Sequence, residues 1–315
     1  MLPQLAAPYL PEARIITLPG RGEAFVRVGP ARPEAATVLL LHGWLATADL
    51  NWFALYEPLV RQYNVIALDH RGHGRGLRSA GPFVLEDTAD DAAAVLDHLG
   101  CGPVIACGYS MGGPIGLHLA QRRPDLVNGL VLCATALEWR DRWHDRLEWR
   151  LLALLSAGLR LGGDQWLAKR IIDDMAAGND LIAQWRPHLL AEAKRLNPRA
   201  ALEAGRALSR FDARPMVAAI DLPAAVVATR RDRLVQPRRQ LQLAEALRAL
   251  RFDLEADHDA FLRQPEAWAD TITQAVNSVA IRLPPSTRPT TNRPTTTTPA
   301  GNANEGPLGT PRRES

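Results

Sequence analysis

The hexapeptide G-Y-S-M-G-G at residues 108–113 constrains the fold of this chain more than any other feature. It follows a short apolar run at residues 104–107 and precedes an apolar, helix-like stretch at residues 114–120. A G-x-S-x-G motif between a strand and a helix predicts a nucleophile elbow, a turn so tight that a side chain at either glycine would collide with its neighbours. Such a turn places the hydroxyl of Ser110 at a helix N-terminus, where the helix dipole stabilises developing negative charge. The alternative is a glycine-rich strand-to-helix turn without chemistry.

The pattern around this motif predicts an α/β fold with a mostly parallel sheet and helices on both faces. Short apolar runs, as buried parallel strands require, lie at residues 38–41, 65–68, 104–107 and 130–133, and the strand pattern resumes at 224–228 and again near 252–254. Helix-like stretches lie at residues 52–62, 85–99, 111–122 and 260–281. Segments 15–18 and 24–28, separated by glycines, predict an antiparallel hairpin before the parallel part.

The strand pattern disappears between residues 136 and 212, where Leu, Ala, Arg and Trp dominate. We interpret this stretch as a helical cap inserted into the core. The chain then divides into a first core segment, the cap, a second core segment and a Pro/Thr-rich tail, at residues 1–135, 136–212, 213–282 and 283–315. The tail has almost nothing apolar to bury, so we expect it to be disordered. Both ends of the cap leave the carboxyl edge of the sheet, so we expect the cap to overhang Ser110.

A serine hydroxyl is a weak nucleophile until a base accepts its proton, so Ser110 needs a histidine and an acid that orients it. With an elbow of this kind the partners follow in the order serine, acid, histidine. Asp232 lies in a loop just after a strand-like run, and His258 follows the last such run. His258 is the only one of the eight histidines downstream of Asp232, so we assign Asp232 as the orienting acid and His258 as the general base. Asp257 and Asp259 are weaker rivals, because sequence neighbours seldom point at the same ring nitrogen.

The tetrahedral intermediate of acyl transfer needs backbone donors aimed at its oxyanion. Met111 directly follows the nucleophile, and Trp44 ends the H-G-W loop that follows a buried strand. Gly43 in that loop allows the backbone to approach the serine closely. We therefore predict that the backbone N–H groups of Met111 and Trp44 form the oxyanion hole.

We assign four ring-bearing side chains to the substrate pocket: His42, Tyr109, Trp139 and Trp143. The two tryptophans are four residues apart and share a helical face, which favours packing on the core. The alternative is a lipid-facing surface, because arginines at positions 140, 142, 146 and 150 flank them. Acidic residues at positions 141, 145 and 148 nearly cancel that charge, so contact with a membrane is not favoured.

Composition argues against several other classes of protein. The 37 basic and 34 acidic residues give a net charge of +3, which makes no case for nucleic-acid binding. Three cysteines cannot form a disulfide framework, and the pair His70 and His73 lacks a third ligand, so we expect no metal and no cofactor. The N-terminus lacks the basic and apolar regions of a signal peptide, so we expect a cytoplasmic protein. The oligomeric state stays open.

Five segments together resemble the α/β-hydrolase superfamily, in its cap-bearing branch of esterases and lipases. They are H-G-W at 42–44, D-H-R-G-H-G at 69–74, G-Y-S-M-G-G at 108–113, R-R-D-R-L-V at 230–235 and D-H-D-A-F at 257–261. The resemblance implies an eight-stranded, mostly parallel sheet with a helical cap after the sixth strand.

The chain departs from the family pattern at a few positions. Asp257 stands where members commonly have glycine, the pair Arg75-Gly76 stands where many have serine, and Leu45 stands where perhydrolase-like relatives tend to have proline. None of these departures removes a catalytic group. A serine at the nucleophile position argues against the epoxide hydrolases and haloalkane dehalogenases of the same fold.

The expected function is therefore that of a serine hydrolase acting on a carboxylic ester, thioester, lactone or lipid with an apolar or acyl group. Carbon–carbon bond hydrolysis and acyl transfer would use the same residues. A ligand-binding or sensing protein on a hydrolase scaffold is the alternative from another class.

Overall fold

A computed structural model of the chain describes residues 9–79, 81–139, 169–170, 173, 177, 180–195 and 197–284. Trp143 and the part of the Pro/Thr-rich tail from residue 285 onward lie outside the described residues. Predictions made for those positions therefore stay predictions.

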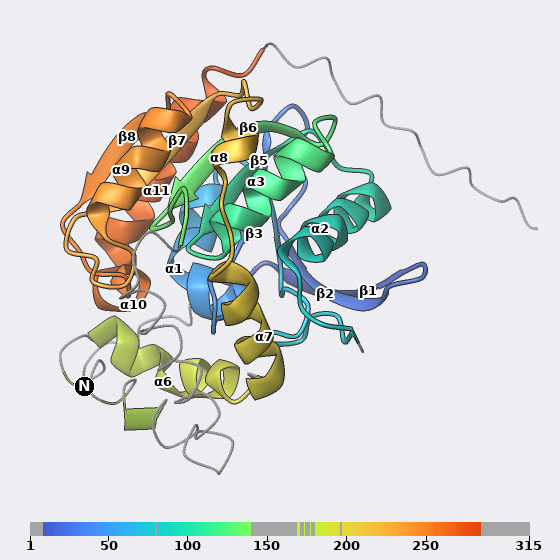
Figure 1. Ribbon diagram of the computed structural model, residues 1–315. Coiled ribbons are helices and arrows are strands. Elements are labelled where there is room, and N and C mark those ends of the chain that lie inside the picture. Colours follow the sequence, from blue (N-terminus) through green and yellow to red (C-terminus); the bar gives the residue numbers. More distant parts are fainter. Residues whose placement is uncertain are drawn as a thin grey trace, which may run out of the picture.

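The described residues form an eight-stranded sheet in the order β1-β2-β4-β3-β5-β6-β7-β8 (Figure 1). Strand β1 pairs antiparallel with β2, β2 pairs antiparallel with β4, and all other neighbours are parallel. The strands are β1 (Glu12–Leu18), β2 (Gly22–Val28), β3 (Thr37–Leu41), β4 (Asn64–Leu68), β5 (Val104–Tyr109), β6 (Val127–Cys133), β7 (Ala224–Thr229) and β8 (Leu250–Leu254). The predicted mostly parallel sheet with a leading hairpin is confirmed.

Helices cover both faces of the sheet. They are α1 (Ala48–Val60), α2 (Leu85–Leu99), α3 (Gly112–Arg122), α6 (Asp180–Ala193), α7 (Pro198–Leu208), α8 (Arg214–Val217), α9 (Pro237–Ala246), α10 (Ala260–Arg263) and α11 (Pro265–Ala280). Side chains of α1 and α11 pack on one face, and those of α2, α3 and α9 pack on the other. Helix α1 follows β3 and α3 follows the adjacent β5, so two adjacent strands lead into helices on opposite faces of the sheet, which is the position where open α/β sheets bind ligands.

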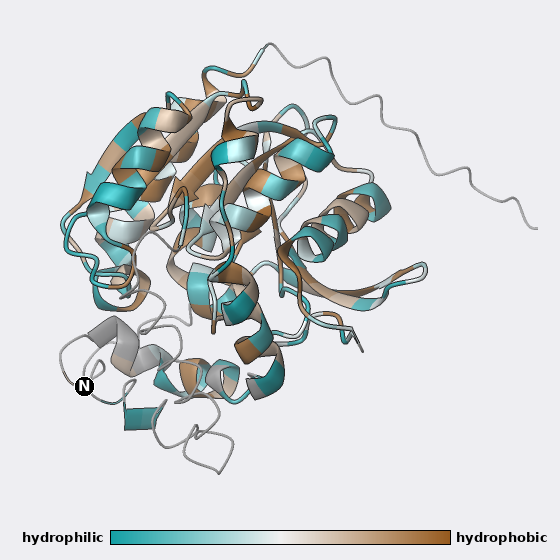
Figure 2. Ribbon diagram, in the orientation of Figure 1, coloured by the Kyte–Doolittle hydropathy of each residue, from teal (hydrophilic) through white to brown (hydrophobic). Residues whose placement is uncertain are grey.

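Strand β3 shows why the buried strands are continuous apolar runs in the sequence. Val38 and Leu40 belong to the core cluster under α1 and α11, whereas Leu39 and Leu41 belong to the cluster under α2 and α3. Side chains alternate between the faces of a strand, so a strand covered on both faces must be apolar at every position. Figure 2 shows the result as brown strands enclosed by helices whose outer surfaces are teal.

The structure corrects two boundaries of the predicted elements. The helix predicted at residues 260–281 is divided into α10 and α11 at Gln264, whose φ is −137°. The cause is Pro265, because the ring of a proline disfavours helical geometry in the residue before it. Strand β8 begins at Leu250, two residues earlier than predicted, because its exposed positions alternate with more buried ones and interrupt the apolar run.

The described part of the insertion is helical and lies at the carboxyl edge of the sheet (Figure 1). An isolated bridge between Glu138 and Asp212 closes its base. In α6, Trp185 stacks on Phe53 of α1 with ring centroids 4.7 Å apart. In α7, the carbonyl of Ala201 accepts a hydrogen bond from the Trp44 indole at 2.7 Å. Within the described ranges, no helix combines the length and apolar character that a membrane span requires.

Candidate active site

The turn between β5 and α3 has the strained geometry that its sequence predicts. Ser110 has φ +51°, a left-handed conformation that non-glycine residues seldom adopt. A Cβ on Gly108 would lie 2.3 Å from the carbonyl oxygen of Gly112, and one on Gly112 would lie 1.9 Å from that of Leu41. Both distances are far inside van der Waals contact, so both motif glycines are required for the turn to close.

The structure brings Ser110, Asp232 and His258 together from three loops at the carboxyl ends of β5, β7 and β8. His258 Nε2 lies 3.0 Å from Ser110 Oγ, and its Nδ1 lies 2.9 Å from Asp232 Oδ2. An ionised carboxylate only accepts hydrogen bonds, so Nδ1 carries the ring proton and Nε2 is free to accept one from the serine. The three side chains therefore have the geometry of a nucleophile, a base and an orienting acid.

Asp232 is held by four groups besides His258. Its Oδ1 accepts the backbone N–H groups of Leu234 and Val235 at 2.9 and 2.7 Å. Its Oδ2 accepts the Thr229 hydroxyl at 2.7 Å and the Gln240 side-chain amide at 3.1 Å. All four donors are neutral, so they fix the carboxylate without cancelling its charge. Sequence reasoning missed Thr229 and Gln240, since neither belongs to a motif.

The two rival carboxylates of the histidine loop face away from the imidazole. Asp257 Oδ2 accepts from Arg233 Nε at 2.6 Å, while its Oδ1 accepts the backbone N–H of His258 at 2.8 Å. Asp259 Oδ2 accepts from Arg263 at 2.6 Å. These ion pairs explain why neither acid orients the ring.

The segments that carry the two predicted oxyanion donors both lie close to the nucleophile. Met111 stands at the N-terminus of α3, where backbone N–H groups lack intrahelical acceptors. A Cβ on Gly43 would lie 3.3 Å from Ser110 Cβ, so the loop approaches the serine as closely as a glycine allows. The N–H of Gly43 itself donates to Asn51 Oδ1 at 2.8 Å. That bond leaves the Trp44 N–H as the loop's proposed donor and identifies Asn51 as a support that the sequence did not reveal.

His42 makes contacts with the loops around it, and its assignment to the substrate pocket stays a prediction. It is fully buried; its Nδ1 lies 2.8 Å from the Gly43 carbonyl oxygen and its Nε2 accepts the His70 N–H at 2.9 Å. The rings of His70 and His73 pack 4.0 and 5.5 Å from that of His42. Burial lowers the pKa of His70 to about 3 and that of His73 to about 4, and it holds the pKa of His42 well below its usual range. We call these three residues the histidine cluster.

Tyr109 lies in the core, and its assignment to the substrate pocket stays a prediction. Its ring is buried among Trp52, Phe261 and Trp268 in the core cluster beneath α1 and α11. Its hydroxyl donates a hydrogen bond to the backbone carbonyl of His258. The residue before the nucleophile thus contacts the backbone of the proposed base.

Trp139 packs in the core on the α2 and α3 side of the sheet and is only 4% exposed. Its backbone N–H donates to the Phe211 carbonyl at 3.3 Å, close to the bridge that closes the base of the insertion. The expectation that this tryptophan packs on the core holds, and its assignment to the substrate pocket stays a prediction.

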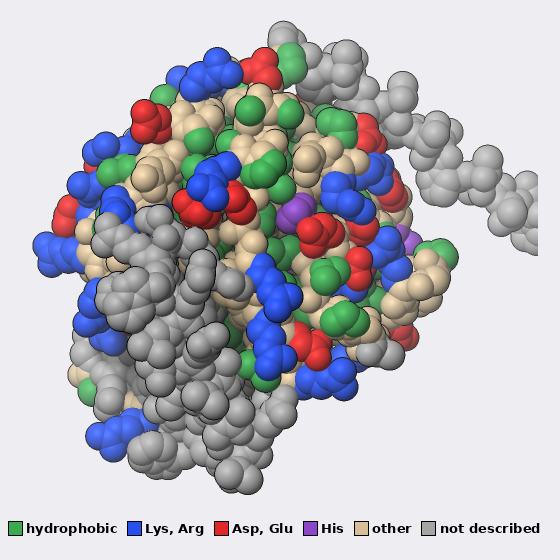
Figure 3. All heavy atoms as spheres, in the orientation of Figure 1, with side chains coloured by type: hydrophobic (Ala, Val, Ile, Leu, Met, Phe, Trp, Pro, Cys, Tyr) green, Lys and Arg blue, Asp and Glu red, His purple; other side chains and the backbone are tan. Residues whose placement is uncertain are grey.

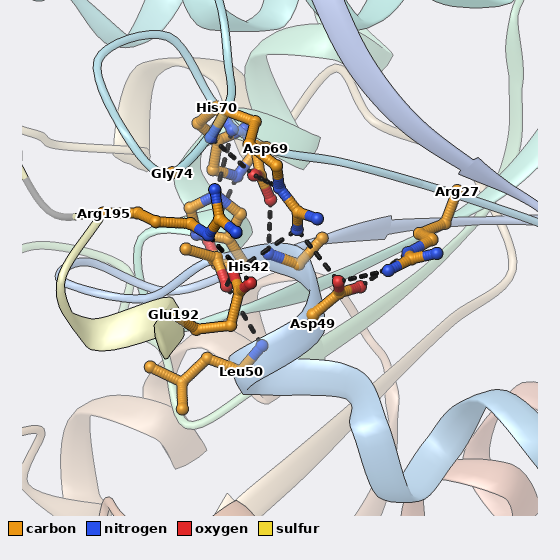
Figure 4. A network of polar contacts seen from close by, with 12 residues as sticks. Arg27, His42, Asp49, Leu50, Asp69, His70, Gly74, Glu192 and Arg195 are labelled. Carbon is orange, nitrogen blue, oxygen red and sulfur yellow. Dashed lines mark hydrogen bonds and ion pairs between the residues drawn. The ribbon is translucent and has the colours of Figure 1, made fainter. Parts of the chain in front are cut away.

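Five charged side chains form a buried ionic network beside the Gly43 loop (Figure 4). Arg27 from β2 makes two bonds to Asp49, at 2.9 and 2.6 Å. Arg75 bridges three carboxylates: Asp49 at 2.9 Å, Asp69 at 3.2 Å and Glu192 at 3.3 Å. Because Glu192 belongs to α6, the network joins the insertion to the core.

The ionic network also fixes the start of α1. Asp69 Oδ1 accepts the N–H of Ala48 at 2.8 Å, and the N-cap residue Thr47 donates its hydroxyl to Glu192 at 2.7 Å. Burial raises the pKa of Asp69. Burial also opposes ionisation of Asp49, but Arg27 and Arg75 outweigh it and hold its pKa below the usual value.

The described residues contain one group with metal-like spacing: Asp49, His188 and Glu192. Both carboxylates already bind arginines, which repel a cation. This donor set does not fit a metal ion. In the H-x-x-H pair, His70 Nε2 lies 3.1 Å from the His42 carbonyl oxygen and His73 Nδ1 lies 3.1 Å from that of Arg71.

Comparison with known proteins identifies the class of protein. A family model described as the alpha/beta hydrolase fold matches residues 36–265. The chain belongs to this family.

Relatives with assigned names resemble most of the chain. The 3-oxoadipate enol-lactonase 2 of Acinetobacter baylyi is 28% identical over 73% of this chain and 85% of the relative. A pimeloyl-(acyl-carrier protein) methyl ester esterase of Neisseria meningitidis serogroup C is 31% identical over 78% of this chain and 96% of the relative. The crystal structure of a hydrolase from Pseudomonas aeruginosa PA01 superimposes with a TM-score of 0.70 at 20% identity, covering 84% of this chain and 98% of that one.

Proposed function

We propose that the protein is a serine hydrolase that cleaves a carboxylic ester-type bond through an acyl-enzyme on Ser110. The observation that carries the proposal is the continuous hydrogen-bond chain from Ser110 through His258 to Asp232. The similarity to a lactonase and to a methyl ester esterase supports bonds of this class, since both names describe hydrolysis of an ester linkage.

The geometry supports a two-step reaction. His258 Nε2 takes the proton of Ser110 as its Oγ attacks the carbonyl carbon, and the imidazolium is stabilised by Asp232. The backbone N–H groups of Met111 and Trp44 receive the developing oxyanion. His258 then gives its proton to the departing alcohol, and a water activated by the same nitrogen releases the acid.

Two exposed apolar side chains support an apolar substrate. Leu45 follows the proposed donor Trp44 and is 42% exposed, and Leu234 lies two residues beyond Asp232 and is 49% exposed. Leu45 also has φ +61°, a strained conformation for a leucine and one that clusters at functional sites. Both loops carry catalytic candidates, so an acyl chain that reaches Ser110 passes beside these leucines.

Labelling with a fluorophosphonate tests the proposal, because the probe reacts only with an activated serine. We expect mass spectrometry to find the label on Ser110 and p-nitrophenyl esters of graded chain length to be hydrolysed. Ser110→Ala should abolish labelling and lower kcat/KM by about 10⁴-fold or more. Ser278→Ala, at a half-buried serine of α11, is the matched control and should change neither.

Other outcomes discriminate the alternatives. Labelling of Ser110 without ester turnover would favour carbon–carbon hydrolysis or acyl transfer by the same residues. Ligand binding with neither labelling nor turnover would favour a sensing protein. Activity of Ser110→Ala within tenfold of the wild type would refute the acyl-enzyme.

A further inference from the structure

A cleft of about 760 Å³ lies between core helices α2 and α3 and the segments α7 and α8. Its volume is in the range of small-molecule sites. The described residues that line it do not include Ser110, Asp232 or His258. His118, which does line it, lies eight residues beyond Ser110 along α3, about 12 Å at 1.5 Å per residue. The cleft is therefore separate from the proposed catalytic site.

Two arginines at one edge of the cleft form no ion pair within the described residues. Arg206 and Arg210 are exposed, and neither side chain forms an ion pair or hydrogen bond with the described part of the chain. They are four residues apart, so the turn of backbone between them brings both to the same edge. Figure 3 shows this face, with basic (blue) side chains beside hydrophobic (green) ones.

The acidic residues on the same side of the cleft are already paired. Glu203 accepts from Arg199 at 2.9 Å and from the backbone N–H of Phe83 at 3.1 Å. Asp212 binds Arg214 at 2.6 Å. Arg199 and, more weakly, Arg206 lower the pKa of Glu203, yet neither Arg206 nor Arg210 forms an ion pair with an acid among the described residues.

The floor of the cleft is apolar and its far wall carries one acid. Phe83, Phe211 and Met216 line it although they are largely buried, and the ring of His118 packs edge-on against Phe211 with centroids 5.5 Å apart. Burial lowers the pKa of His118, so its ring is neutral at pH 7. Glu86 lies 3.8 Å from His118 on the α2 side and repels a second negative charge.

We propose that this cleft is a second binding site, which takes a monocarboxylate with an apolar body. The carboxylate pairs with Arg206 and Arg210, and the apolar part lies over Phe83 and Phe211. A dianion is disfavoured because Glu86 faces the opposite end. The ligand contacts α7 of the cap and the core helices together, so its binding couples the two. The proposal does not depend on the proposed hydrolysis.

Isothermal titration of the full-length Ser110→Ala protein with octanoate tests the site without turnover. We expect octanoate to bind, Arg206→Gln/Arg210→Gln to weaken it at least tenfold, and octanamide, which lacks the charge, to bind at least tenfold more weakly than octanoate. The matched control is Arg248→Gln/Arg282→Gln, which removes two other exposed arginines without ion partners in the described residues and should change binding less than twofold.

Hydrogen–deuterium exchange locates the bound ligand. Octanoate should slow exchange in α7 and at the start of α2, and this protection should disappear in the Arg206/Arg210 double variant. Absence of octanoate binding, equal binding by the double variant, or equal binding of octanamide would each overturn the proposal.

Discussion

Two groups of aspartate and histidine side chains meet at the same edge of the sheet, and only one of them has reactive geometry. At the ends of β5, β7 and β8, Asp232 accepts neutral donors and the imidazole of His258 faces a serine. At the ends of β3 and β4, the carboxylates of the ionic network bind Arg27 and Arg75, and the histidine cluster contacts backbone. The comparison teaches that the bonding partner decides the role of a buried acid or imidazole. An arginine neutralises the charge of a carboxylate, whereas a neutral donor leaves that charge able to stabilise an imidazolium.

The largest difference between the two groups should be in catalysis. Asp232→Asn removes the acceptor that fixes the His258 tautomer, so we expect kcat/KM to fall by about 10⁴-fold with little change in Tm. Asp257→Asn is the matched control, because that carboxylate is next to His258 in sequence yet faces Arg233. We expect the kcat/KM of Asp257→Asn to fall by less than about tenfold. If kcat/KM for ester hydrolysis fell equally in both variants, Asp232 would not act as an orienting acid distinct from the structural Asp257.

The second difference should be in stability. Asp49→Asn leaves Arg27 and Arg75 buried without this partner, which should cost about 3–5 kcal/mol of unfolding free energy and lower Tm by about 10 °C. Asp253→Asn, at a half-exposed ion pair with Arg251, should cost less than about 1 kcal/mol. Chemical denaturation measures both. A fall in kcat for Asp49→Asn as large as that for Asp232→Asn would show that the ionic network takes part in the reaction.

The histidine cluster should make stability depend on pH. The pKa values of His70 and His73 are depressed in the folded protein, so below about pH 6.5 the unfolded chain binds protons that the folded one does not. Stability should therefore be full above this pH and fall as the solution is acidified, by about 2 kcal/mol per histidine at pH 5. His73→Gln should flatten the slope by about 1.4 kcal/mol per pH unit, whereas exposed His98→Gln should not. An unchanged slope in His73→Gln would mean that this imidazole is protonated in the fold.

The smallest effect should come from a substitution of Tyr109, whose hydroxyl joins the core to the backbone of His258. Tyr109→Phe keeps the ring but removes the hydroxyl that holds the His258 carbonyl, so we expect kcat to fall about tenfold with KM nearly unchanged. Tyr63→Phe removes a similar bond, to Asn277 at 2.6 Å, and should leave kcat intact. If both variants lose only stability, the Tyr109 hydroxyl does not position the base.

Much of this arrangement follows from local sequence patterns. The strands covered on both faces are continuous apolar runs, and the elbow has a spacing that only glycines allow, so the sheet and Ser110 could be placed. The order of the motifs along the chain identified Asp232 and His258 as the partners of Ser110. The contacts of His42 and Tyr109 could not be predicted, because the local sequence around a ring-bearing residue beside a motif is the same whether its side chain faces substrate or core.

The supporting polar contacts could not be predicted because they join residues far apart in the chain. The Thr47 hydroxyl and Glu192 are 145 positions apart, and Tyr109 and the His258 carbonyl are 149 apart. No periodicity or spacing connects such pairs. Asn51 is closer, eight residues after Gly43, but its role depends on how α1 turns back over the loop.

Glu192 fastens one of the two described helices of the insertion to the core in a way that the other does not share. Lifting α6 would pull a buried carboxylate away from Arg75 and Thr47, at a cost of about 3–5 kcal/mol, so fewer than about one molecule in a hundred would be open there at any moment. Helix α7 makes two hydrogen bonds to the core, with the Trp44 indole and with the Phe83 N–H, and its Ala204 and Leu208 are buried in the core cluster. Opening at α6 therefore separates buried charges, whereas opening at α7 exposes apolar surface, so the two movements should respond differently to salt and to urea.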